Sequence, residues 1–103
     1  MKVFETEGAQ LLFQALLSLK DEAECKAFLE DILTTGEMLA LSQRILVAKY
    51  LTEGKVYSKI AEETGASSAT ISRVNRCYHY GSDGYKTVFA RLQGEDKDAE
   101  GKL

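Results

Sequence analysis

The segment of residues 57–78, YSKIAEETGASSATISRVNRCY, restricts the fold more than any other part of the 103-residue chain. Its informative positions are Ile60, Ala61, Gly65, Ile71 and Val74. The first two fit the inner face of a short helix, and the last two, three apart, give a second helix its buried stripe. Between the helices the chain must turn sharply, and glycine adopts the left-handed backbone of such a turn cheaply. The pattern predicts a helix-turn-helix over about residues 57–80.

The opposite face of the second helix is small, polar and basic. It carries Ser68, Ala69, Ser72, Arg73 and Arg76. Short side chains let a helix enter the major groove of DNA, and arginines can reach phosphates or a guanine edge. This face therefore predicts a helix that reads DNA. The alternative is a pair of helices that forms a structural corner and has no DNA partner.

The composition favours a single all-α domain. The chain has no proline and is rich in residues that favour helices, notably Leu, Ala, Glu and Lys. We expect one domain over residues 1–92 and a polar, flexible tail over residues 93–103. No apolar run is long enough to cross a membrane, and the N-terminus lacks the order of a secretory signal. We therefore expect a cytoplasmic protein with no membrane partner.

Two helices are expected at the start of the chain. A longer third helix follows them and precedes the helix-turn-helix. Residues 7–19 carry leucines on one broad stripe, which predicts an amphipathic helix with more apolar surface than one small partner would cover. Asp21 and Glu24 have the spacing of a capping pair for a second helix that runs to about residue 33.

Thr34 and Glu37 have the same spacing, so the threonine can accept the Glu37 amide and the carboxylate can reach back. The third helix that follows runs to about residue 53. It is apolar nearly all round, and we expect it to be buried nearly all round. After a turn at residues 81–84, a sixth helix is expected over residues 85–92. Its inward-facing side chains are expected to be Tyr85, Val88, Phe89 and Leu92.

The first and third helices together carry too much exposed leucine for a monomer of this size. A homodimer built through them is the simplest resolution. A two-fold dimer would also present two reading helices one turn of DNA apart, roughly 34–36 Å.

The net charge of -3 conceals an uneven distribution along the chain. Residues 1–43 carry 3 basic and 8 acidic groups, whereas residues 44–92 carry 8 basic and 4 acidic groups. The basic part coincides with the predicted helix-turn-helix. A locally positive face on an acidic protein is compatible with DNA binding and disfavours indiscriminate contact with polyanions. Ordinary solvated surface is the alternative interpretation.

Enzyme and metal chemistry have little support in the sequence. Cys25 and Cys77 are too few and too far apart for a disulfide scaffold, and we expect both to be reduced and partly buried. Cys77 with His79 is not a metal-ligand spacing, so no metal or cofactor is expected. No nucleophile–base pair accompanies the single histidine, so no enzyme is expected. An adaptor that keeps the helix-turn-helix shape but binds a protein is the alternative to a DNA-binding regulator.

From about Phe28 onward, over about two thirds of its length, the chain resembles the tryptophan repressor superfamily, and more closely its YerC/YecD branch. The matching segments are ILTTGEMLALSQR from Ile32, EGK from Glu53, IAEETGASSATISRVNRC from Ile60 and YGSDGY from Tyr80. The first 27 residues match only in being helical and apolar. The resemblance implies an intertwined, all-α homodimer with two reading heads that binds double-stranded DNA as a transcriptional repressor.

The same resemblance implies which residues meet DNA. Those facing the groove would be Ser67, Ser68, Ala69, Thr70 and Ser72. Ser58 and Lys59, at the start of the first helix of the motif, would contact phosphates.

The resemblance also bears on an effector pocket. Arg44 and Arg73 match the two arginines that hold the tryptophan indole in the repressor, and Thr34 matches a threonine that lines the same pocket. The repressor has glycine after the second arginine, whereas this chain has Val74. A branched side chain would fill the space of the ligand, and even a methyl-sized clash costs about 1–3 kcal/mol. We therefore do not expect tryptophan as the effector. Carboxylate pairing, a phosphate contact or another ligand would then explain the arginines.

Overall fold

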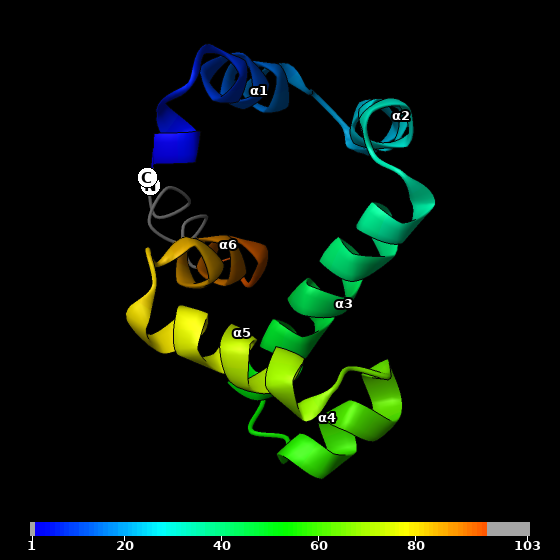
Figure 1. The fold of residues 1–103 in the computed structure, drawn as a ribbon, viewed down its shortest axis with the longest axis vertical. Helices are drawn as coiled ribbons and strands as arrows, with labels where there is room; N and C mark the ends of the chain where they lie inside the picture. Colours follow the sequence, from blue (N-terminus) through cyan, green and yellow to red (C-terminus); the bar gives the residue numbers. More distant parts are fainter. Residues whose placement is uncertain (1, 95–103) are drawn as a thin grey trace. The chain divides into compact units, whose positions relative to one another are not determined.

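The computed structural model of the chain describes residues 2–94, and it contains helices and no strand within that range (Figure 1). The elements are η1 (Lys2–Glu5), α1 (Glu7–Ser18), α2 (Glu22–Ile32), α3 (Thr35–Thr52), α4 (Tyr57–Thr64), α5 (Ser68–Tyr80) and α6 (Gly84–Leu92). The expected all-α class with a helix-turn-helix is confirmed. The short helix η1 was not expected, because four residues are too few to show periodicity. Most of the predicted tail, residues 95–103, lies outside the described residues.

Both predicted capping pairs are present. Thr34 Oγ1 accepts the N–H of Glu37 at 3.1 Å, and the Glu37 carboxylate accepts the N–H of Thr34 at 2.9 Å. Asp21 accepts the N–H of Glu24 at 2.9 Å, while the Glu24 carboxylate accepts the N–H of Lys20 at 2.9 Å. These bonds satisfy amide donors that the start of a helix leaves without a partner.

The chain divides into two compact units, one ending at Met38 and the other beginning at Leu39. The first unit contains η1, α1, α2 and the start of α3. Phe4 of η1 stacks on Phe13 of α1, with 6.3 Å between ring centroids. None of the described residues of this unit is buried, and Leu17 is 86% exposed. Within a single chain, the first unit therefore has no core of its own.

The second unit contains the buried core. Its members are Val47, Ala48, Ile60, Ala66, Ile71, Val74 and Phe89. They come from α3, α4, the turn, α5 and α6, so all four helices of the unit meet at one cluster. Complete burial of an isoleucine side chain is worth about 1.5–3 kcal/mol. Because each large buried side chain contributes this much, a small number of them holds the helix-turn-helix against α3 and α6.

Two expectations about burial are wrong for the single chain. In α3, two residues are buried, and Leu39 is 66% exposed. In α6, Phe89 is buried and Tyr85 is half-buried, but Val88 is 44% exposed and Leu92 is 72% exposed. Periodicity shows which face of a helix is apolar. It does not show whether the surface that covers this face belongs to the same chain.

Candidate nucleic-acid interface

The helix-turn-helix has the internal packing that its spacing predicts. α4 and α5 contact each other, and Ile60 of α4 and Ile71 of α5 are both fully buried. Gly65 joins the helices with a φ of 75°, which is left-handed backbone. Its N–H donates to the carbonyl of Ala61 at 2.9 Å, and Ala61 itself packs against the core.

Hydrogen bonds fix the turn and connect it to α3. Thr64 Oγ1 donates to the carbonyl of Ile60 at 2.7 Å and accepts the N–H of Ala66 at 3.1 Å. Gln43 Nε2 of α3 donates to the carbonyl of Thr64 at 3.2 Å. Ala66 is buried, so the turn has an apolar anchor as well as these polar ones. Gln43 cannot be identified from the sequence, because its partner is a backbone carbonyl on a distant element.

The two helices of the motif begin differently. Ser67 Oγ accepts the N–H of Thr70 at 3.1 Å, and the two hydroxyl oxygens are also 3.1 Å apart. These two residues, both predicted to face DNA, thus form the N-terminal cap of α5. Val56 precedes α4 and provides no side-chain cap. Among the described residues, no side chain accepts a hydrogen bond from the first amide N–H groups of α4, and this arrangement suits an external anion.

The residues predicted to contact DNA are accessible in the single chain. Those exposed are Ser58, Lys59, Ser67, Ser68, Ala69, Ser72, Arg73 and Arg76, and Thr70 is half-buried. Those from Ser68 onward lie on α5, whereas the first two belong to α4. Accessibility is necessary for DNA contact, and the contact itself stays a prediction.

In the described part of the second unit, every lysine takes part in an ion pair, whereas three arginines do not. The ion pairs are Lys49–Glu53, Lys55–Glu63, Lys59–Glu62, Lys59–Glu63 and Lys86–Asp83. All lysines and all carboxylates of residues 44–92 take part, so the net positive charge of that segment equals the charge of its arginines. Within residues 2–94, Arg44, Arg73 and Arg76 have no ion-pair partner.

Lys55 connects the end of α3 to α4. Its Nζ lies 3.7 Å from the centroid of the Tyr50 ring and pairs with Glu63 Oε1. This hydrogen bond raises the pKa of Lys55, and it lowers the pKa of Glu63. Each group therefore stabilises the charged form of the other. This pair cannot be identified from the sequence, because its members belong to different elements.

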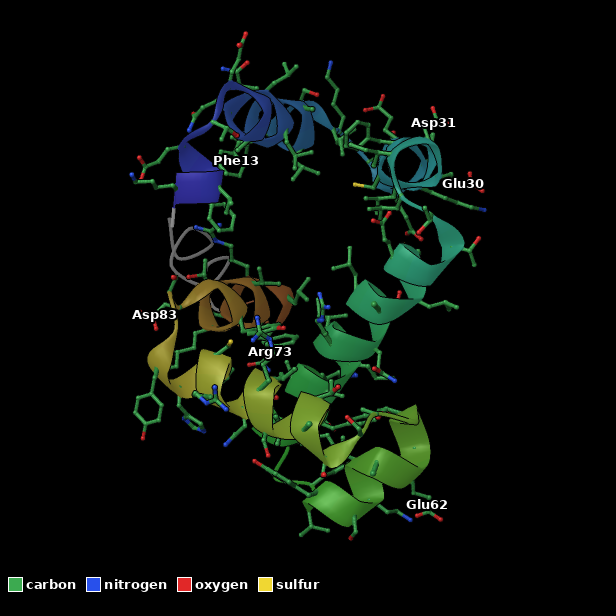
Figure 2. All side chains as sticks on the ribbon, in the orientation of Figure 1. Phe13, Glu30, Asp31, Glu62, Arg73 and Asp83 are labelled. Carbon is green, nitrogen blue, oxygen red and sulfur yellow. The ribbon has the colours of Figure 1, made fainter. Side chains whose placement is uncertain are left out.

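Arg44 of α3 and Arg73 of α5 both lie close enough to Tyr85 of α6 to affect its titration. Burial raises the pKa of the Tyr85 hydroxyl, the Cys77 thiol raises it further, and the two guanidinium groups partly oppose the rise. Figure 2 shows Arg73 projecting from α5 on the side where α6 lies. The structure thus brings two predicted pocket residues near one tyrosine, for which the sequence predicts only a place in the core.

The other two predicted pocket residues have structural roles. Val74 is 3% exposed and belongs to the core cluster. Thr34, in the first unit, provides the side-chain cap of α3. Neither role requires a ligand.

Cys25 and Cys77 are free thiols and both are exposed, so the expectation that they are partly buried is wrong. A small apolar side chain is buried only where another element covers it, and sequence alone does not show that cover. Among the described residues, no three His, Cys, Asp or Glu side chains gather as metal ligands would. Over the same range, no helix has both the length and the hydropathy of a membrane span.

The packed helix pair, the left-handed turn and the serine-capped second helix define a helix-turn-helix protein. The chain belongs to the Trp repressor family: the family model described as "Trp repressor protein" matches residues 7–93. The resemblance seen in the sequence is therefore confirmed. The match also includes most of the first 27 residues, which by themselves resemble the family only in being helical and apolar.

Relatives agree with this membership. The chain is 44% identical over 104 residues to "Uncharacterized protein YerC" of Bacillus subtilis (strain 168), covering 99% of this chain and 100% of that protein. The crystal structure of a TrpR like protein from Eubacterium eligens ATCC 27750 is similar, with a TM-score of 0.86 and 55% identity. That comparison covers 90% of this chain and 96% of the other. A "putative Trp repressor" from Staphylococcus aureus has a TM-score of 0.81 and 42% identity, covering 90% and 95%.

Proposed function

We propose that this protein is a sequence-specific, DNA-binding transcriptional regulator rather than an enzyme, acting as a repressor in the cytoplasm. α5 enters the major groove of double-stranded DNA. The observation that carries this proposal is the division of charge in the second unit. Arg73 and Arg76 are exposed on α5 and have no carboxylate partner among the described residues. Membership of the Trp repressor family supports the same function.

The DNA contacts that we propose fall into two groups. Arg73 and Arg76, with Ser58 and Lys59 at the uncapped start of α4, contact phosphates. The groove is read by Ser67, Ser68, Ala69, Thr70 and Ser72. These side chains are short and offer few bidentate contacts to base edges, so water-mediated contacts and DNA shape supply part of the sequence preference.

We propose that the active form is a homodimer joined through the apolar surfaces that one chain leaves exposed. The first unit has no buried residue among those described, and Leu17 and Leu39 are exposed by 86% and 66%. Apolar surface of this extent favours association. A second copy of the chain would cover it and would supply a second α5, so that two half-sites roughly 34–36 Å apart are read together.

Tryptophan is not the effector in this proposal, because the Val74 side chain takes part in the core. A thermal-shift titration tests this point. We expect no saturable stabilisation by tryptophan, whereas a ligand that binds the folded state raises the unfolding temperature with concentration. Stabilisation that saturates would contradict this part of the proposal.

The test of DNA binding uses Arg73→Ala, Arg76→Ala and the double variant, with fragments selected from genomic DNA by the unmodified protein. Each single variant is expected to bind at least about fivefold more weakly, from the loss of ~1 kcal/mol or more per arginine contact. Lys49→Ala is the matched control, because it removes one positive charge from a residue already paired with Glu53. Circular dichroism and the unfolding midpoint establish that each variant is folded.

Unchanged affinity in both single variants and the double variant would contradict the assignment. The alternative function is an adaptor that binds another protein, and the exposed apolar side chains of α1 and α3 are the feature that favours it. DNA retained at low salt and released as salt rises supports the regulator. No DNA retained even at low salt supports the adaptor.

A further inference from the structure

We infer that Glu62 competes with DNA phosphates for Lys59, and so lowers the affinity of the helix-turn-helix for DNA of any sequence. This inference rests on the proposed function, because it concerns a predicted phosphate contact. It gives a role to the acidic side chain that lies next to this lysine.

Lys59 lies between two carboxylates on its own helix. Its Nζ is 3.7 Å from Glu62 Oε1 and 3.9 Å from Glu63 Oε2. The Lys59 side chain is 56% exposed, so water and an external anion can reach it. Lys59 is also the third residue of α4, near the positive end of the helix dipole, where a cation is locally unfavourable. Nearby carboxylates therefore offset its charge while no phosphate is present.

The two carboxylates are held differently. Glu63 is 32% exposed and also binds Lys55, and the Lys55 contact is the largest cause of its lowered pKa. Glu62 is 72% exposed and pairs with Lys59 alone. Figure 2 shows Glu62 pointing outward from α4. Glu63 is thus part of the link between α3 and α4, whereas the pair between Lys59 and Glu62 is open to solvent, so Lys59 can exchange Glu62 for another anion.

A phosphate that approaches Lys59 shares the ammonium with Glu62, whose carboxylate offsets part of the attraction between Lys59 and the phosphate. This competition acts on any duplex, because phosphates are the same in every sequence. Exposed ion pairs of this kind are weak, so the effect on DNA affinity is expected to be a few-fold rather than many-fold.

The experiment compares Glu62→Gln with the unmodified protein by fluorescence anisotropy, using a random-sequence duplex at low salt. We expect binding about two- to fivefold tighter, with an unchanged unfolding midpoint. Asp83→Asn is the matched control. Asp83 also pairs with a lysine three residues away and its side chain is also 72% exposed, but it lies outside α4. Asparagine suits its backbone, whose φ is 65°.

A double-mutant cycle with Lys59→Gln identifies the route of the effect. If Glu62 acts through Lys59, its substitution gains little or nothing in the Lys59→Gln background. The inference is overturned if Glu62→Gln leaves affinity unchanged, if Asp83→Asn tightens binding equally, or if the gain persists without Lys59. In each of these cases DNA is still bound, and the proposed function stands. Absence of DNA binding by every variant instead removes the proposed function, and this inference with it.

Discussion

Replacing Gly65 with alanine tests whether the turn of the helix-turn-helix depends on left-handed backbone. Gly65 has a φ of 75°, a region that costs other residues about 1–2 kcal/mol. A Cβ at this position would meet no atom of the described residues within 4 Å, so no clash with them adds to this cost. Alanine also lowers the conformational entropy of the unfolded chain, and this offsets about 0.4–1 kcal/mol of the backbone cost. With both terms at the middle of their ranges, the expected net loss of stability for Gly65→Ala is about 0.8 kcal/mol.

Gly81 provides the contrast. Its φ of -90° is ordinary for any residue, but a Cβ there would lie 2.4 Å from the carbonyl oxygen of Cys77. The backbone at the end of α5 would have to shift, and overpacking of this kind costs about 1–3 kcal/mol. Asparagine tolerates left-handed backbone better than alanine does. Asparagine should therefore be less harmful than alanine at position 65, and no better than alanine at position 81.

Urea unfolding followed by circular dichroism measures these differences. All variants are compared at one protein concentration, because association makes apparent stability depend on concentration. In thermal unfolding, 1 kcal/mol corresponds to roughly 4–8 °C for a domain of this size. The reasoning is refuted if Gly65→Ala is as stable as the unmodified protein, or if alanine and asparagine are equivalent at that position.

Three further predictions concern the same unit. Ile71 is fully buried, so Ile71→Ala should cost about 2–5 kcal/mol and Ile71→Val about 0.5–1.5 kcal/mol in urea unfolding. Ser67→Ala removes the acceptor of the Thr70 amide and should cost about 0.5–2 kcal/mol by the same measurement. Glu63 has a lowered pKa, so its stabilising effect is present above the ordinary carboxyl pKa and is lost as the pH falls through the folded-state pKa. Lys55 has a raised pKa, so its effect is present below the ordinary amine pKa and is lost as the pH rises through the raised value. Unfolding midpoints measured against pH should show a smaller acid-side decline for Glu63→Gln, and an identical decline would contradict the pairing.

Interactions between near neighbours in the sequence could be predicted with good accuracy. Thr34 and Glu37 are three residues apart, and the reciprocal cap that they form depends only on local helix geometry. Ile71 and Val74 are likewise buried on one stripe of α5. Gly65 adopts the left-handed backbone that its position between two apolar patterns predicts. The helix-turn-helix is built almost entirely from such local signals, which is why it could be read from the sequence.

Contacts between distant elements could not be predicted in the same way. The bond from Gln43 to the Thr64 carbonyl joins residues 21 positions apart, and the chemistry of glutamine does not specify a partner. The proximity of Arg44 to Tyr85 depends on how α3 and α6 pack. The exposure of Leu92 shows a further limit, since periodicity does not show whether an apolar face is covered by the same chain or by another. For the candidate interface, the sequence identified the accessible residues on α5 but not which charges are already neutralised.

The salt dependence of DNA binding tests most directly whether the unpaired arginines of α5 meet DNA. The measurement is the slope of the logarithm of the binding constant against the logarithm of salt concentration, with a selected genomic fragment. Each phosphate contact contributes about -0.9 to this slope. If Arg73 and Arg76 each neutralise a phosphate, the double alanine variant binds more weakly, and its slope is shallower by roughly 1.8. A double variant with the affinity and slope of the unmodified protein would contradict contact between these arginines and DNA phosphates.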